Sequence, residues 1–249
     1  MKRYGILDEL RGITLVSMIL YHAVWDLVYV YGVDWKWFYT PFAYVWQQSI
    51  CWTFILLSGF CWSLGHKQLR RGLIVSGAGL VVMLVTELFT PGQRIRFGVL
   101  TLLGIAMLVM IPLEKLLKQV KAAYGAVVSL LLFLITRNIN DGNLGFEGVK
   151  LVELPEALYH NGDIATLVGF TDWSFFSTDY FSVIPWLFLF VTGYFLYRLL
   201  AERQLLDKLG EWRCGGKLLA FMGKQSLIIY MLHQPIIYLG LYLIFTGFV

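Results

Sequence analysis

Long apolar runs constrain the fold of this chain more than any other feature of its sequence. A helix needs roughly 20 consecutive apolar residues to cross the hydrocarbon core of a bilayer, where every backbone polar group must be satisfied internally. Runs near this length lie at residues 12–31, 43–64, 72–89, 98–113, 121–137, 181–200 and 226–248. The sequence therefore predicts an all-α, polytopic membrane protein with about seven transmembrane helices in a single domain, residues 1–249.

The composition agrees with a membrane protein. Hydrophobic residues make up 58% of the chain and charged residues only 14%, whereas soluble domains carry about 25% charged residues. We interpret the net charge of +4 as a topology signal and expect no nucleic-acid partner. The three cysteines, Cys51, Cys61 and Cys214, lack the spacing of a metal site, so we expect inert thiols and no metal.

Lys and Arg are distributed unevenly between the segments that would lie on the two sides of the membrane. With the N-terminus inside, fifteen of the 20 basic residues fall on the inner side and five on the outer side. Basic residues are enriched in cytoplasmic loops. The sequence therefore predicts a cytoplasmic N-terminus and an outside C-terminus, in a multi-pass protein of the cell (inner or plasma) membrane.

The longest segment on the expected outer side spans about 138–180. Structureless loops of this length are uncommon in compact proteins. We expect its stretch VELPEALYHNGDIATLVGF to form one or two short amphipathic pieces along the outer surface.

Ionisable residues interrupt the first apolar run. A helix turns about 100° per residue, so Arg11 and His22, eleven residues apart, point the same way and lie roughly 16 Å apart along the axis. Asp8 and Asp26 extend the same stripe at either end. Such groups are costly in lipid, and the stripe should face protein or a water-filled cavity.

Three interpretations of this stripe stay open. In an enzyme, His22 would act as general base, and Asp26 would accept a hydrogen bond from the other ring nitrogen of His22. Arg11 would hold an anionic group near the cytoplasm. In a proton-coupled small-molecule transporter, His22 and Asp26 would relay protons. In a non-catalytic scaffold, they would clamp two helices together.

Five blocks of the sequence, in order, resemble those of one family. They are RYGILDELRGITLVSMILYHAVWDL, WTFILLSGFCWSLG, RIRFGVLTLLGIAML, TDYFSVIPWLFLFVTGYFL and FMGKQSLIIYMLHQPI. Together they resemble bacterial relatives of heparan-α-glucosaminide N-acetyltransferase, in the transmembrane acyltransferase superfamily. The chain departs from the family pattern at Thr101, where many relatives have His, and at Ser182, which replaces a Pro. Met222 also precedes the Gly of the last block.

The resemblance implies an enzyme that moves an acyl group, usually acetyl, from cytoplasmic acyl-CoA to a sugar or glycan acceptor on the outer side. It implies that His22 is the catalytic histidine and Arg11 its partner in the motif. The acceptor, N- versus O-acylation, the acyl chain length, a covalent acyl-His intermediate and a possible homo-oligomer all stay open.

Further residues are candidates for the two substrates. His233 and Gln234 precede Pro235 in the last run, where the expected depth suits the pantetheine arm of CoA. Ser58, Tyr21 or Gln234 would donate to the oxyanion. The expected CoA-binding residues are Arg11, Ser58, Arg70, Arg71, His233 and Gln234, although plain topology also explains the basic ones.

Two residues near the sixth run are candidates for the acceptor, Asp179 and Trp186. Asp179 would bind a sugar hydroxyl or an ammonium, or would cap a helix start. For Glu87 we expect an ion pair with Arg94 or Arg96.

Overall fold

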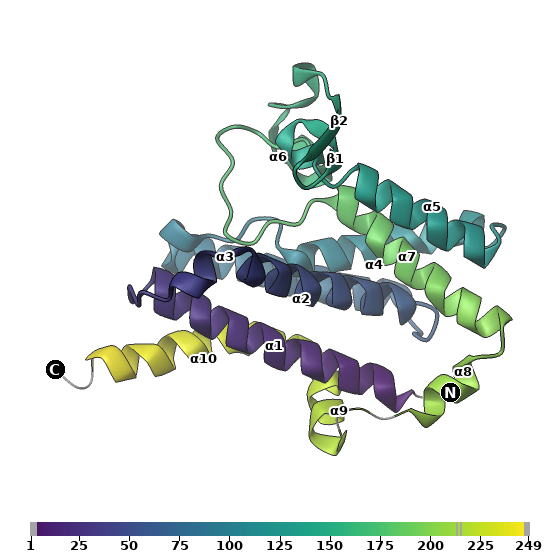
Figure 1. Cartoon of the computed structure of the whole chain (residues 1–249), viewed down its shortest axis with the longest axis horizontal. Coiled ribbons are helices and arrows are strands. Elements are labelled where there is room, and N and C mark those ends of the chain that lie inside the picture. Colours follow the sequence, from purple (N-terminus) through teal and green to yellow (C-terminus); the bar gives the residue numbers. More distant parts are fainter. Residues whose placement is uncertain (1–3, 213, 215, 247–249) are drawn as a thin grey trace. The chain divides into compact units, whose positions relative to one another are not determined.

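The computed structural model describes residues 4–212, 214 and 216–246, and most of them are helical. A helix occupies each of the seven predicted runs (Figure 1). These helices are α1 (Gly5–Tyr29), α2 (Pro41–Phe60), α3 (Gln68–Phe89), α4 (Val99–Leu117), α5 (Ala122–Ile135), α7 (Val183–Glu202) and α10 (Ser226–Thr246). The all-α membrane class is therefore confirmed.

Among the described residues, five helices are long and apolar enough to cross a membrane: α1, α3, α4, α7 and α10. Helix α5 has 14 residues, or about 21 Å, which is shorter than the ~30 Å hydrocarbon core. Helix α2 has 20 residues, but Gln47 and Gln48 make its first half more polar. Seven spans and the orientation of the termini stay predictions.

The chain forms two compact units. One contains the residues up to Phe54 and those from Gln204 onward, and the other contains 55–203. The predicted single domain stays a prediction.

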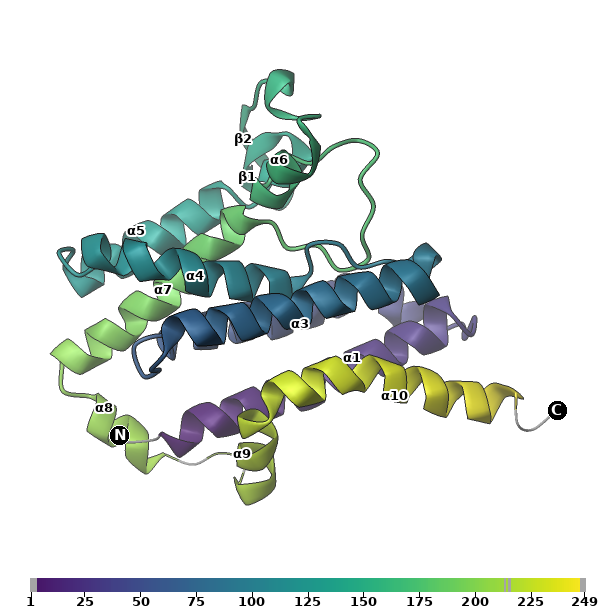
Figure 2. The same ribbon diagram turned by 180° about the vertical axis from the view of Figure 1, so that it is seen from behind.

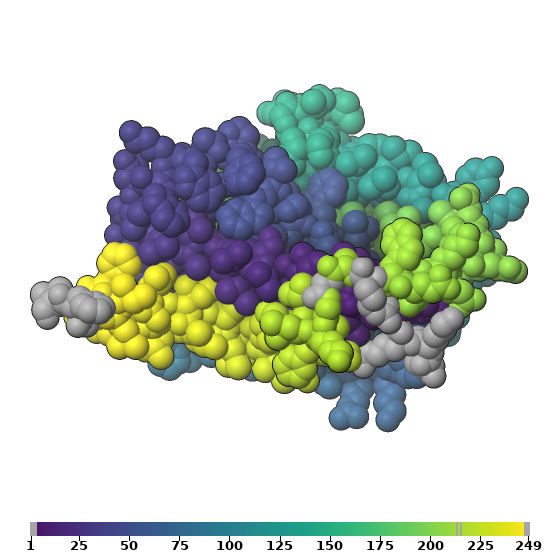
Figure 3. All heavy atoms as spheres, turned by 60° about the horizontal axis from the view of Figure 1, so that its bottom comes forward, coloured from purple at the N-terminus to yellow at the C-terminus, as the bar shows by residue number. Residues whose placement is uncertain are grey.

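In the first unit, α1 packs against α10 and against the short helix α9 (Gly216–Lys224), as Figures 2 and 3 show. Two glycines bring the backbones of α1 and α9 into contact. A Cβ added at Gly12 would meet the Leu219 backbone, and one at Gly223 would meet the Asp8 backbone. Small residues allow such close helix approach in membranes.

The first half of α2 also packs on α1. The Trp46 indole N–H donates to the Ser17 hydroxyl at 2.8 Å. The short 3₁₀ helix Lys36–Tyr39 precedes α2 and buries Phe38 against Val28 of α1. Helix α8 (Leu206–Glu211) completes this unit.

In the second unit, α3 pairs with α4 and α5 pairs with α7. Thr101, where many relatives of the resembled family have His, packs against Gly79 at the α3–α4 contact. The Thr192 hydroxyl of α7 donates to the Ser129 hydroxyl of α5 at 2.9 Å. The expected ion pair of Glu87 is confirmed, with its partner Arg94 at 3.7 Å.

The segment between α5 and α7 has more structure than the sequence suggested. It contains the antiparallel strands β1 (Asn143–Phe146) and β2 (Val149–Glu153), the 3₁₀ helices Ile139–Asp141 and Glu156–Leu158, and α6 (Gly162–Val168). The short helices agree with the expected pieces, but the hairpin was not predicted. Its turn is the pair Glu147–Gly148, a two-residue connection typical of hairpins. Buried Asn138 donates to the Glu147 carbonyl at 2.7 Å and fixes this turn.

Asp179 caps a helix, but not the one that follows it in the chain. Its carboxylate accepts from the backbone N–H of Val99 at 3.3 Å, at the start of α4. Burial raises the pKa of this carboxyl from 3.8 to about 6. The folded protein therefore holds the Asp179 proton more tightly than the unfolded chain does.

The Gly12 contact predicts a loss of stability in Gly12→Ala. The added methyl group would force α1 and α9 apart, at a cost of about 1–3 kcal/mol. Thermal unfolding of the purified protein in detergent measures the loss. Gly77→Ala is the matched control, since a Cβ there meets no atom within 4 Å. Equal melting temperatures for the two variants would contradict the close contact.

The raised pKa of Asp179 predicts a pH-dependent stability. A protonated Asp179 stabilises the fold below about pH 4, and this contribution is lost as the pH rises through about 6. The melting temperature of the wild type should fall across this window relative to that of Asp179→Asn, which stays neutral. Glu153→Gln, on exposed β2, should keep the wild-type profile. Parallel profiles for wild type and Asp179→Asn would contradict the assignment.

Candidate functional site

A hydrogen bond between two distant parts of the chain organises the candidate site. Asp26 of α1 is completely buried, and both of its carboxylate oxygens accept from the Gln234 side-chain amide of α10 at 2.9 Å. A buried carboxylate needs a donor, because an unpaired charge in an apolar interior is very costly. The pair therefore ties α1 to α10 at this depth.

The predicted contact between Asp26 and His22 is wrong. Among the hydrogen bonds of the described residues, those of the Asp26 carboxylate come from Gln234, and none comes from His22. The four-residue spacing does place both side chains on one face of α1, as expected. However, the amide of Gln234 reaches the carboxylate from the neighbouring helix and occupies it.

His22 lies against a second histidine instead. The ring centroids of His22 and His233 are 4.9 Å apart, with the ring planes at 62°. His22 is half-buried, and its other aromatic neighbour is Tyr21, edge-on at 6.0 Å. The site thus combines two imidazoles from α1 and α10 with the carboxylate–amide pair.

The hydrogen bonds of His233 indicate its tautomer. Its Nδ1 lies against the Tyr230 carbonyl oxygen, one turn earlier in α10, so Nδ1 carries the proton in the neutral ring. Nε2 then carries a lone pair. This atom is buried and has no hydrogen-bond partner in the described part of the chain. It is therefore an acceptor that a ligand could satisfy.

Gln234 presents a second acceptor of this kind. Its amide nitrogen donates to Asp26, and its Oε1 is buried without a hydrogen-bond partner among the described residues. Pro235 comes next and cannot donate a backbone N–H, which leaves the Met231 carbonyl without its usual helical partner. This part of α10 therefore offers several acceptors.

Arg11 occupies the opposite end of the α1 stripe. Its guanidinium lies 3.6 Å from the Asp8 carboxylate, one turn earlier, and is 22% exposed. The neighbouring Glu9 accepts from the Cys214 backbone N–H at 2.6 Å. The four residues of the expected stripe, Asp8, Arg11, His22 and Asp26, all belong to α1.

The remaining candidates belong to the second unit. Ser58 is half-buried in α2, while Arg70 is exposed and Arg71 half-buried in the first turn of α3. Trp186 is only 3% exposed and packs against Phe133 and under the Arg137 guanidinium. Packing therefore explains Trp186, and little of its surface is left for a substrate.

The cross-helix pairs could not be found from the sequence. Asp26 and Gln234 are 208 residues apart, and the sequence carries no signal that pairs the first long run with the last. The sequence did show polar residues inside the first and the last apolar run, which marked both as candidate parts of a site. Among the described residues, no group of three or more His, Cys, Asp or Glu side chains is arranged to hold a metal ion.

Comparison with known proteins identifies the family. The family model described as "Heparan-alpha-glucosaminide N-acetyltransferase, catalytic" matches residues 3–235. No curated protein and no solved structure matches the chain. The match covers nearly the whole sequence and includes both halves of the α1–α10 site. The resemblance seen in the sequence is confirmed, and the chain belongs to the family of heparan-α-glucosaminide N-acetyltransferase catalytic domains.

Proposed function

We propose that this protein is a membrane-embedded acyltransferase that moves an acetyl group from acetyl-CoA to an amino or hydroxyl group of a sugar acceptor, with His22 as general base. The observation that carries the proposal is the His22–His233 pair, in which the His233 Nε2 atom is buried and has no hydrogen-bond partner among the described residues. Family membership supports acetyl transfer and gives no support to the proton-coupled carrier.

The chemistry needs a group that accepts a proton and later returns it. The acceptor nitrogen or oxygen attacks the thioester carbonyl carbon while neutral His22 takes its proton. The tetrahedral intermediate then collapses, the C–S bond breaks, and the leaving thiolate takes the proton from His22 as CoA–SH. The acceptor gains the acetyl group, and His22 returns to its neutral form.

His233 and Gln234 would serve the reaction as hydrogen-bond acceptors. The His233 Nε2 lone pair and the Gln234 Oε1 atom can receive N–H groups, such as the amides of the pantetheine arm or the acceptor amine. Gln234 is less suited to the oxyanion role expected from the sequence, because its N–H group already serves Asp26. Tyr21 and Ser58 stay candidates for that role.

The Asp26–Gln234 pair would act as a positioning device. It fixes α10 against α1 four residues from His22, and His233 is the direct neighbour of Gln234 in the chain. A shift of α10 would therefore change the distance between the two imidazole rings. Small misplacements of catalytic groups can cost about 10²-fold in rate.

The CoA phosphates would bind at basic residues on the inner side. Arg70 and Arg71 lie in the first turn of α3, which begins at Gln68 directly after Lys67. A guanidinium group can bind two phosphate oxygens at once. Arg11 stays a separate candidate for an anionic group of CoA. This assignment requires the proposed cytoplasmic N-terminus and a location in the cell membrane.

The base assignment predicts loss of turnover in His22→Gln. Removing a general base should lower kcat about 10²–10⁴-fold while the melting temperature changes little. Release of CoA thiol from acetyl-CoA in the presence of amino sugars measures turnover. Ile13→Val, at a 40% exposed position of α1, is the control and should keep wild-type rates. Full activity in folded His22→Gln would overturn the assignment.

The buried Asp26–Gln234 pair predicts that a double variant regains stability but not activity. Gln234→Leu leaves the Asp26 carboxylate buried without its donor and should cost about 3–5 kcal/mol. Adding Asp26→Leu removes the orphaned charge and should restore much of the melting temperature, because replacing both partners by apolar groups is often nearly neutral.

Activity should not follow stability in this series. The double variant should keep a lowered kcat, since the imidazole rings lose their alignment. A cycle of the two single variants and the double variant, measured for unfolding and for turnover, tests this. Additive unfolding energies would show that the two side chains do not interact.

A further inference from the structure

The short helix α9 runs crosswise to both of its helical neighbours, α1 and α10, which belong to the same unit (Figure 2). Both neighbours are long and apolar enough to cross a membrane. A helix that runs across two membrane-spanning helices lies along the plane of the membrane. Helices in this position bind the bilayer surface when one face carries apolar and basic side chains.

One face of α9 is occupied by α1. Backbone contacts at Leu219 and Gly223, four residues apart, hold α9 against Gly12 and Asp8 of α1. Helix α1 begins at Gly5, so these contacts lie roughly 5–10 Å from its end. Helix α9 therefore lies near one end of a membrane span, where the lipid headgroups begin.

The opposite face of α9 is exposed and amphipathic. Leu218 is 71% exposed and Phe221 is 58% exposed, and Lys217 and Lys224 are exposed as well. At about 100° per residue, these four side chains fall within an arc of roughly 120°, with the lysines toward one edge and Leu218 at the other. Apolar and basic side chains thus occupy neighbouring strips of one exposed face.

The two lysines of this face lack an acidic partner in the described part of the chain, whose ion pairs include neither of them. The acidic residues at this end of α1 have other partners. Asp8 lies 3.6 Å from Arg11, and Glu9 accepts from the Cys214 backbone N–H at 2.6 Å. The ammonium groups of α9 are therefore available to an anionic ligand at the surface.

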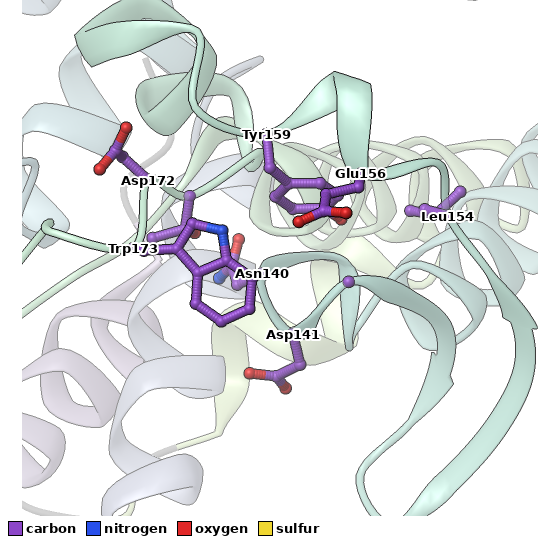
Figure 4. A pocket seen from close by; sticks show the side chains of 9 residues that line it. Asn140, Asp141, Leu154, Glu156, Tyr159, Asp172 and Trp173 are labelled. Atoms are coloured by element: carbon purple, nitrogen blue, oxygen red, sulfur yellow. The ribbon is translucent and has the colours of Figure 1, made fainter.

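The segment between α5 and α7 has the opposite charge. It forms a cavity of about 340 Å³ whose lining includes Asp141, Glu156 and Asp172, and none of the lining residues is Lys or Arg (Figure 4). Hydrogen bonds from Ser174 lower the pKa of the Asp172 carboxyl and keep it ionised. This segment would repel anionic headgroups, so it offers a comparison for α9.

We propose that α9 binds anionic phospholipids at the membrane surface, with Lys217 and Lys224 against the phosphate groups and Leu218 and Phe221 in the apolar layer below them. Lysine side chains can reach headgroups while their methylene stems stay on apolar surface. Each lysine near an anionic membrane surface contributes an attraction equivalent to roughly fivefold in affinity. The charge and the orientation of α9 both favour a lipid surface over a second protein as the occupant.

The position of α9 bears on the candidate site through the chain itself. Only Gln225 separates α9 from α10, and His233 lies roughly 10 Å from the start of α10. A lipid that holds α9 therefore also holds the start of the helix that carries His233 and Gln234. We expect anionic lipid to raise turnover, an expectation that rests on the proposed acetyltransferase function.

Quenching by brominated lipids tests the lipid contact without requiring turnover. A fluorescent label is attached to Leu218→Cys in the whole chain, with the exposed Cys214 replaced by Ser. The Cys214→Ser protein without the new cysteine gives the background from Cys51 and Cys61. In nanodiscs, we expect the label to show a preference of roughly fivefold or more for brominated phosphatidylglycerol over brominated phosphatidylcholine.

Two double variants and a second label position provide the controls. Lys217→Gln/Lys224→Gln should lose the preference, whereas Lys36→Gln/Lys150→Gln, which removes two exposed lysines outside α9, should keep it. A label at Ile164→Cys, a 79% exposed position in the acidic segment, should show no preference.

Two results would overturn the lipid site. One is equal quenching by the two lipids at α9, or equal preferences in the two double variants. The other is a label at α9 that neither lipid quenches, which would place this face against protein or water.

Turnover in the same nanodiscs separates this proposal from the proposed function. The wild-type kcat should be higher with phosphatidylglycerol than with phosphatidylcholine alone, and Lys217→Gln/Lys224→Gln should lose this difference. Selective quenching in a protein without transferase activity in either lipid would keep the lipid site and remove the enzyme. Equal kcat in the two lipids would keep the enzyme and overturn its control by lipid charge.

Discussion

The hydrogen bond between Asp26 and Gln234 is the interaction on which the candidate site depends. A carboxylate with no exposed surface is tolerated only where a donor reaches it, and here one amide serves both oxygens. Because the two residues come from opposite ends of the chain, this bond determines which part of α10 faces which part of α1. The alignment of His22 with His233 follows from it.

The sequence predicted the helices well because their signal is local. Each apolar run became a helix, and the polar stripe of α1 followed from helical geometry alone. The Asp26 contact was mispredicted for a related reason: spacing along one helix shows which side chains share a face, but not which neighbour reaches them. The β-hairpin was missed because its strands are only four and five residues long.

The role of Asp179 shows a similar limit. A cap on the helix start after Asp179 was one of its two expected roles, yet the capped amide belongs to Val99, 80 residues earlier. Trp186 resembled a substrate contact because it stands in a family block beside Pro185, but its ring fills the core between α5 and α7. Family blocks therefore locate the important positions more reliably than they assign their roles.

The unpartnered atoms of α10 have a consequence for the choice of nucleophile. His233 Nε2 and Gln234 Oε1 are both lone-pair acceptors without a hydrogen-bond partner among the described residues. A group that binds here can satisfy these acceptors only with its own N–H or O–H hydrogens, so the number of these hydrogens sets how many acceptors it satisfies. A neutral amine, the form that attacks a thioester, brings two and an alcohol brings one, so hydrogen count alone would favour binding of an amine over an alcohol at these acceptors.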